Sequence, residues 1–259
     1  ATDMLCMSYS TPDIVGHAFG PYSLEIEDIY ARLDLELAKL FNTLDKQVGK
    51  HNYVVFLTAD HAVVPVPQQL TDEKLPGGYF DMSACLTSIN TQIQKKYGSI
   101  LIQSEENQNI YLDNPLIDSL KLNRSVIQQE VASILRSFPE VKVAVTGSDL
   151  ERGIIQDPWM QMILNGYSKE RSGDVIFILK PGYLAISSNA SSEHKGTSHG
   201  SAFNYDTHVP LLWYGNRMKH QEIFRPLEIT DISATLVHML KLQRIGSMTG
   251  KPIVEILGH

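Results

Sequence analysis

The chain has 259 residues, which is enough for one large α/β domain or for one that carries a small inserted subdomain. Hydrophobic residues make up 43% and charged residues 20% of the sequence, as in ordinary globular proteins, and no apolar run reaches the roughly 18–20 residues that cross a bilayer. The net charge of -7 argues against nucleic acid as the main partner, because phosphate-backbone binding needs a concentrated basic face.

The first 60 residues predict a strand, a helix and a second strand. Residues 4–9 are short and apolar, which predicts a buried strand with Cys6 in the core, and a sequence that opens inside a strand without a signal peptide is expected to be a piece of a longer protein. From Ser23, a typical helix cap, apolar residues recur at three- and four-residue steps, which predicts a long helix that ends at Gly49. Residues 53–58 form the second predicted strand. This βαβ order favours a parallel sheet covered by helices.

The middle of the chain predicts a small α+β insertion. Its expected elements are a helix at 83–97, strands at 100–103 and 109–112, a helix at 125–138 and a strand at 141–146. An irregular stretch at 149–173 follows, and then a strand at 174–180, an exposed loop at 187–200, a strand at 209–214 and a helix at 229–240. The predicted fold class is α/β, a mostly parallel sheet with helices on both faces. Residues 1–70 and 148–259 would form its metal-binding core and residues 71–147 the insertion.

Two pairs of metal-binding side chains follow the first two predicted strands. In Asp13-Ile-Val-Gly-His17 the Asp and His stand four residues apart, so on a turn or helix they project the same way and can share one ion. Asp60 and His61 directly follow the second strand. Either pair alone is weak, since a turn Asp and a surface His are common. Ligands of open α/β sheets bind beyond the carboxyl ends of the strands, so we expect both pairs at one edge of the sheet.

A third motif, Gly196-Thr-Ser-His199-Gly200, places a histidine between glycines that let the backbone approach a ligand. His208 competes with it but sits at the mouth of a strand, where it could equally be packed, so we favour His199 as the ligand and His208 as a supporting residue. Five nitrogen and oxygen donors are too many for one zinc ion and suit a pair, and mixed His and carboxylate donors favour Zn²⁺ over calcium or magnesium. Two metals about 4 Å apart can stabilise the attacking and leaving oxygens of a phosphoryl transfer.

Together with the segments at 228–240 and 249–252, these three motifs resemble the alkaline phosphatase superfamily, in particular the bacterial periplasmic phosphatases related to type I phosphodiesterases and nucleotide pyrophosphatases. The resemblance implies that Asp13, His17 and His199 hold one zinc ion, and that Asp60 and His61 hold a second with help from another Asp. It also implies hydrolysis of small phosphate esters through a phosphorylated Thr or Ser nucleophile, and a periplasmic or secreted location.

The sequence also departs from this family. The nucleophile, the remaining Asp ligand and the side chains that grip the phosphate are expected in an N-terminal half that precedes the first predicted strand, so we expect this chain alone to be inactive or nearly so and its second zinc site to bind more weakly. Ala62 stands where the family usually has Gly. The leading hypothesis is a phosphate monoesterase. A phosphodiesterase or nucleotide pyrophosphatase on the same fold, and a metal-binding module without catalysis, are the alternatives.

Overall fold

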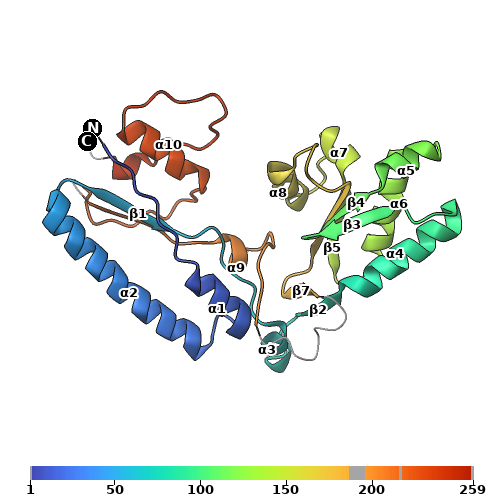
Figure 1. The fold of residues 1–259 in the computed structure, drawn as a ribbon, viewed down its shortest axis with the longest axis horizontal. Helices are drawn as coiled ribbons and strands as arrows, with labels where there is room; N and C mark the ends of the chain where they lie inside the picture. The colour runs from blue at the N-terminus through green and yellow to red at the C-terminus, as the bar shows by residue number, and fades with distance from the viewer. Residues whose placement is uncertain (1, 187–195, 216–217, 258–259) are drawn as a thin grey trace. The chain divides into compact units, whose positions relative to one another are not determined.

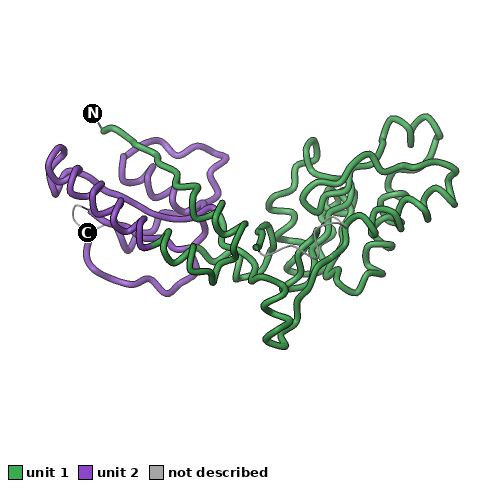
Figure 2. The backbone as a smooth tube through the Cα atoms, turned by 60° about the horizontal axis from the view of Figure 1, so that its bottom comes forward, with its two compact units in different colours: residues 1–30, 61–209 green, residues 31–60, 210–259 purple. Residues whose placement is uncertain are grey.

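The computed structural model describes residues 2–186, 196–215 and 218–257. The chain divides into two compact units (Figure 2): unit 1 comprises residues 1–30 and 61–209, and unit 2 comprises residues 31–60 and 210–259. It passes from the first unit to the second within the long helix α2 (Leu24–Leu44). Each unit therefore joins segments that are far apart in the sequence.

A four-stranded sheet forms the centre of unit 1. Its strands lie in the order β3-β4-β6-β5, and all of its pairings are antiparallel. Helices cover both of its faces (Figure 1), with α4, α5 and α6 on one face and α7 and α8 on the other. The strands are β3 (Ile102–Glu106), β4 (Asn109–Leu112), β5 (Val141–Thr146) and β6 (Val175–Leu179). The helices are α4 (Met82–Tyr97), α5 (Asn114–Ser119), α6 (Arg124–Arg136), α7 (Gly147–Glu151) and α8 (Pro158–Gly166).

Side-chain alternation along β6 explains why both faces of this sheet are covered. Successive side chains of a strand point to opposite faces. Phe177 is buried in the larger core with Ile89 of α4 and Ile127 of α6, whereas its neighbour Ile176 packs with Met160 of α8 in a smaller cluster. A strand that is apolar at every position therefore buries both of its faces.

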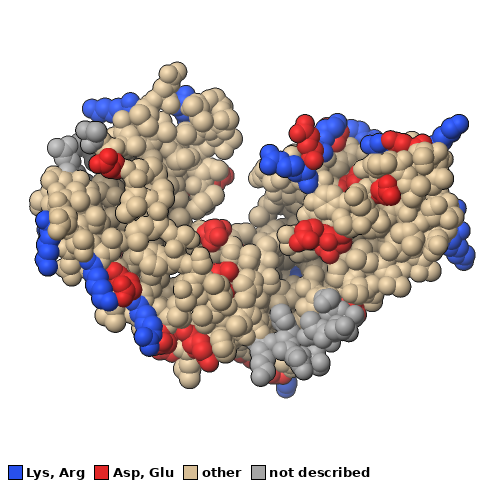
Figure 3. All heavy atoms as spheres, in the orientation of Figure 1, with Lys and Arg blue, Asp and Glu red and all other residues tan. Residues whose placement is uncertain are grey.

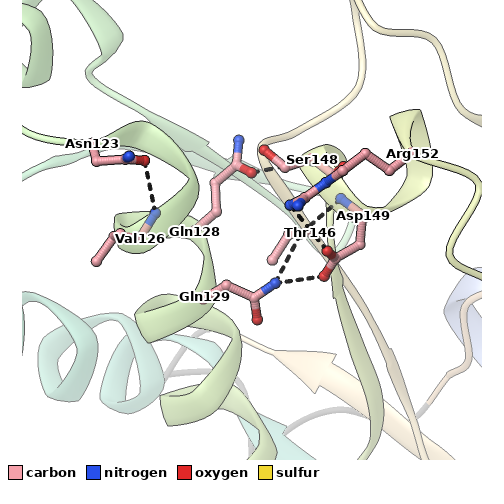
Figure 4. A network of polar contacts seen from close by, with 8 residues as sticks. All are labelled: Asn123, Val126, Gln128, Gln129, Thr146, Ser148, Asp149 and Arg152. Carbon is pink, nitrogen blue, oxygen red and sulfur yellow. Dashed lines mark hydrogen bonds and ion pairs between the residues drawn. The ribbon is translucent and has the colours of Figure 1, made fainter.

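A polar network closes one end of this core, where α6 meets α7 (Figure 4). The side chain of Gln128, which is only 7% exposed, donates to Asp174 Oδ1 at 3.0 Å and accepts from the Ser148 N–H at 3.2 Å. The neighbouring Gln129 donates to Asp149 Oδ2 at 2.5 Å. The buried amide of Gln128 is thus hydrogen-bonded on both sides, as a polar group must be when it leaves water.

The remaining elements of unit 1 lie outside this sheet. Strands β2 (Gly78–Asp81) and β7 (Tyr183–Ile186) form a separate parallel pair. Three short helices complete the unit: α1 (Thr11–Phe19), α3 (Pro67–Asp72) and α9 (Asn204–Thr207). Among the described residues, no helix of the chain is both long and apolar enough to span a membrane.

Unit 2 is built on one antiparallel strand pair, β1 (Val54–Thr58) and β8 (Leu211–Gly215). Phe56 and Trp213 lie opposite each other with their rings 5.2 Å apart, and Phe41 of α2 packs on Tyr214 at 5.1 Å. The unit also contains the helices η1 (Asp45–Gly49), α10 (Thr230–Met239) and η2 (Val254–Ile256). No residue of either strand is buried, although nearly all of them are apolar.

Charged side chains of both signs are mixed on the surface. On the face drawn in Figure 3, Lys and Arg alternate with Asp and Glu along the lower left edge, and the described Lys and Arg residues visible on this face form no continuous patch. The arrangement accords with the net charge of -7.

The predicted first strand is wrong. Residues 4–9 form no regular element, and Met4, Leu5 and Met7 are 65%, 76% and 53% exposed. Cys6 is exposed as well, so it is not the core residue that we expected, whereas Cys85 is fully buried. A strand needs a neighbour to satisfy its backbone groups, and no strand among the described residues pairs with this segment.

The α/β class is confirmed, but the strand directions differ from the expected mostly parallel sheet. Among the described residues only β2 and β7 pair in parallel. Because residues 4–9 provide no strand, β1 has no parallel crossover partner and pairs instead with β8, from the far end of the sequence. The domain ranges 1–70 with 148–259, and 71–147, stay a prediction.

Most of the other predicted elements are present, but several observed elements were not predicted, among them α3, β2, α5, β7 and α8. The helix from Ser23 is confirmed, since Ser23 Oγ accepts from the Ile26 N–H at 3.3 Å, and η1 ends at Gly49 with a φ of 98°. Helix α8 lies in the stretch 149–173 that we expected to be irregular. Its signal was Asp157-Pro158: the Asp157 side chain accepts from the Met160 N–H at 3.0 Å, and proline suits the first turn of a helix. Of the predicted loop 187–200, residues 187–195 lie outside the described residues.

Candidate metal centre

Helix α1 brings Asp13 and His17 together. Pro12 lies in its first turn, where a missing N–H costs nothing, and the two polar residues sit one turn apart at opposite ends of this short helix. His17 Nε2 lies 3.3 Å from Asp13 Oδ1. The four-residue spacing in the sequence therefore does place both side chains on one side of a helix, as predicted.

Two further histidines converge on the same carboxylate oxygen. His199 Nε2 lies 3.8 Å and His61 Nε2 lies 3.9 Å from Asp13 Oδ1. The His61 and His199 rings are stacked, with centroids 3.4 Å apart and planes inclined by 11°, and the His17 ring lies 5.1 Å from that of His199. Three histidines from three separate segments of unit 1 thus surround one oxygen.

Backbone carbonyls fix which nitrogen of two rings faces this oxygen. His17 Nδ1 lies 2.9 Å from the carbonyl oxygen of Thr197, and His61 Nδ1 lies 2.9 Å from that of Ala62. A carbonyl can only accept, so Nδ1 carries the proton in each ring, and Nε2 of the neutral ring keeps its lone pair for a ligand. Burial, and then the neighbouring His61, lower the pKa of His199, which favours the neutral form that binds metals.

The donor set fits a zinc ion. Asp13 Oδ1 is buried and has no hydrogen-bond partner among the described residues. Donor atoms of Asp13, His17 and His199 all lie within 4.8 Å of one another. Two ligands on a tetrahedral zinc with bonds of about 2.0–2.1 Å are about 3.4 Å apart, close to the 3.3 Å between His17 Nε2 and Asp13 Oδ1. A shared cation would satisfy the orphaned oxygen, and the family resemblance implies this trio as the ligands of the first ion.

The loop that carries His199 is anchored on α1 and on the segment after His61. Thr197 is 1% exposed, and its Oγ1 donates to the carbonyl oxygen of Val64, whose own N–H donates to the Ser198 carbonyl at 3.1 Å. A Cβ on Gly196 would lie 1.7 Å from the carbonyl oxygen of His17, so only glycine allows the loop to approach α1 this closely.

One residue of this framework was missed from the sequence. Asp206 is 2% exposed, its Oδ2 accepts from the Ser201 N–H at 2.6 Å, and its carbonyl oxygen accepts from the Ala62 N–H at 2.7 Å. It therefore joins the segments that follow His199 and His61. The only available signal was its place between Tyr205 and Thr207, two residues before the histidine that drew attention.

Two further predicted residues, His208 and Asp60, are not among the side chains whose contacts are described above. His208 follows α9 and is exposed, and its backbone N–H donates to the Asn204 carbonyl at 3.0 Å. Asp60 is exposed and belongs to unit 2. The supporting role of His208 and the metal-binding role of Asp60 stay predictions.

Comparison with known proteins identifies the family. The sequence profile of type I phosphodiesterase / nucleotide pyrophosphatase matches residues 1–202, a span that includes Asp13, His17, Asp60, His61 and His199. The chain therefore belongs to the type I phosphodiesterase and nucleotide pyrophosphatase family. This confirms the resemblance on which the sequence analysis rested.

Two of the similar proteins are alkaline phosphatases by name. Alkaline phosphatase PafA of Elizabethkingia meningoseptica is 37% identical over 261 residues, which cover 100% of this chain and 46% of the relative. Alkaline phosphatase PhoV of Synechococcus elongatus is 34% identical over 256 residues, or 99% of this chain and 45% of the relative. The crystal structure of wild-type PafA superposes with a TM-score of 0.87 and 36% identity over 96% of this chain and 46% of that one. The chain thus spans just under half the length of these relatives.

Proposed function

We propose that the protein to which this chain belongs hydrolyses phosphate monoesters with the help of two zinc ions. One observation carries the proposal: the buried Asp13 Oδ1, which has no hydrogen-bond partner among the described residues, faces Nε2 of His17, His61 and His199. A metal-binding set of this type suits hydrolysis, and the relatives named alkaline phosphatases favour monoesters as the substrate class.

Each side chain has a separate task in this proposal. Asp13, His17 and His199 would hold the first ion, and Asp60 and His61 would contribute to the second. Bound zinc supplies a Lewis acid that polarises a phosphoryl oxygen. Thr197 holds the His17 ring through its carbonyl oxygen, so that Nε2 rather than Nδ1 faces the site. The Asp13 carboxylate would offset part of the charge of the cation that it shares with the neutral imidazoles.

The nucleophile and the phosphate-binding side chains would come from the part of the protein that this chain does not include. The relatives are about twice as long as the matched region. The apolar strands β1 and β8, which bury no residue, and the exposed Met4 and Leu5 support a further part of the protein that covers them. On this proposal the 259-residue chain alone turns over no substrate. Turnover by the purified chain would contradict it.

The test uses the full-length protein. Hydrolysis of nitrophenyl phosphate and of bis(nitrophenyl) phosphate would be compared with and without a chelator, and after zinc is added back. We expect chelator-sensitive monoester turnover that His199→Ala lowers by at least about 100-fold, because removal of a metal ligand disables the site. His220→Ala, an exposed histidine of unit 2, is the matched control and should leave turnover unchanged. Activity that resists both the chelator and His199→Ala would overturn the proposal.

Phosphodiester hydrolysis is the second candidate, because the matching family profile is that of a type I phosphodiesterase and nucleotide pyrophosphatase. Faster turnover of the diester would assign the protein to that activity and leave the metal ligands as proposed. Zinc binding without turnover of either ester would favour a metal-binding module. A periplasmic or secreted location follows only from the family resemblance and stays a prediction.

A further inference from the structure

A cavity of about 340 Å³ lies beside the candidate metal centre, within unit 1. This volume is in the range of small-molecule sites. Ser198, His199 and Ser201 line it from the loop that carries His199, which we call the metal-binding loop (residues 196–201). Ser83 and Leu86 of α4 and Glu105 of β3 also line it.

Contacts inside unit 1 hold these two sets of lining residues together. The Gly182 N–H, in the turn between β6 and β7, donates to the Tyr205 hydroxyl of α9 at 3.1 Å. The ring of Trp159 in α8 packs on that of Phe203 at 4.9 Å. The metal-binding loop is therefore fixed against the α+β part of the unit, and the cavity has walls on defined elements.

The lining is apolar in part and acidic where it is charged. Met82 and Leu86 contribute apolar surface, and Glu105 and Asp206 are the charged residues; no Lys or Arg is among the described residues that line the cavity. Asp206 is only 2% exposed and its Oδ2 accepts from the Ser201 N–H, whereas Glu105 is half-buried. Glu105 is anchored through Oε1, which accepts from the Gln108 N–H at 2.9 Å in the turn between β3 and β4. Its carboxylate is the group of this lining best suited to meet a ligand.

We propose that this cavity binds the alcohol part of the phosphate ester and that Glu105 selects an uncharged, hydroxyl-bearing alcohol over one that carries a second anionic group. The inference rests on the proposed function for the position of the phosphate. A phosphate held beside His199 directs the rest of the ester into the adjoining space. There a hydroxyl group can donate to the carboxylate, whereas a second phosphate or carboxylate would meet like charge that no Lys or Arg of the described lining offsets.

The test compares two ligands of similar size that differ in charge. The zinc-loaded full-length protein would be titrated with 4-(hydroxymethyl)phenylphosphonate and 4-carboxyphenylphosphonate, two analogues that cannot be hydrolysed. We expect the wild type to bind the hydroxymethyl compound more tightly, and Glu105→Gln to reduce that preference by about 3- to 10-fold, the size of one nearby charge at a partly solvated site. The glutamine keeps an oxygen that can accept from the Gln108 N–H, so the turn should persist.

Glu106→Gln is the matched control, because Glu106 is the next residue of β3, is exposed and does not line the cavity. An unchanged preference in Glu105→Gln, or an equal change in Glu106→Gln, would overturn the cavity proposal. The two proposals fail separately. If the protein hydrolyses monoesters but Glu105→Gln keeps the ligand preference of the wild type, only the cavity proposal is wrong. If Glu105→Gln shifts the ligand preference as expected but the protein hydrolyses no monoester, only the proposed phosphatase activity is wrong.

Discussion

Replacement of Gly196 by alanine tests how the metal centre is built. A Cβ at this position would lie 1.7 Å from the His17 carbonyl oxygen, and Cβ atoms in proteins essentially never approach other atoms closer than 3.0 Å. The loop or α1 must therefore move by about 1.3 Å, whereas zinc–ligand distances tolerate only about 0.2 Å. Because the loop carries both His199 and the carbonyl oxygen that orients His17, we expect Gly196→Ala to weaken zinc binding by about 10- to 100-fold or more.

The assay is a competition titration of the 259-residue chain with a chromophoric chelator, with circular dichroism to confirm folding. The unmutated chain should bind one zinc ion tightly, at Asp13, His17 and His199, and a second more weakly. Gly166→Ala is the matched control, since a Cβ at Gly166 would meet nothing within 4 Å. Zinc binding by a folded Gly196→Ala as tight as in the unmutated chain would refute this account of the site.

Three further predictions concern the chain as folded. Burial raises the pKa of Cys85 to about 12, so this thiol stays protonated at pH 8, and a thiol reagent should label only exposed Cys6 until denaturant is added; rapid native labelling of both would be contrary. Ile127→Ala leaves a cavity at a fully buried site and should lower the free energy of unfolding by about 2–5 kcal/mol in denaturant titrations. The adjacent Val126 is 48% exposed, so Val126→Ala should lower it by less than about 0.5 kcal/mol. Gln128→Leu should cost about 1–3 kcal/mol by the same measurement, because it strips hydrogen bonds from a buried network, and a neutral effect would contradict that reading.

Local sequence signals predicted the elements whose stability is local. The helix that begins after Ser23 has a capping serine and apolar residues at helical spacing, and the structure confirms the cap and the helix α2. Residues 4–9 carry an equally apolar pattern but form no strand. An apolar segment can be buried, but it forms a strand only if the backbone of another segment pairs with it. The six residues themselves do not specify which segment that partner is. The same reasoning explains the direction of β1, whose partner β8 comes some 150 residues later in the chain.

In the candidate site, too, local sequence predicted the contacts within one helix but not those between distant segments. The spacing of Asp13 and His17 predicted their approach because one helical turn sets it. The stacking of His61 on His199 could not be read from the sequence, since it depends on hydrogen bonds between segments more than 130 residues apart, such as that from Thr197 to Val64. Asp206 was missed for a related reason. Its importance lies in the backbone groups that it joins, and side-chain motifs carry no signal for such a role.

These hydrogen bonds also explain what positions the side chains of the cluster. Neutral imidazoles whose Nε2 lone pairs face a carboxylate oxygen are not attracted to it, and the lowered pKa of His199 opposes the protonation that would create such an attraction. The cluster is held instead by its backbone: the Thr197 carbonyl fixes His17, the Thr197 hydroxyl holds the Val64 carbonyl, and Gly196 allows the contact with α1. When hydrogen bonds from neighbouring residues already hold the ligand side chains in place, little binding free energy is lost in ordering these side chains as an ion binds. Hence the sequence requirement extends to Gly196 and Thr197, two residues that would never touch the metal.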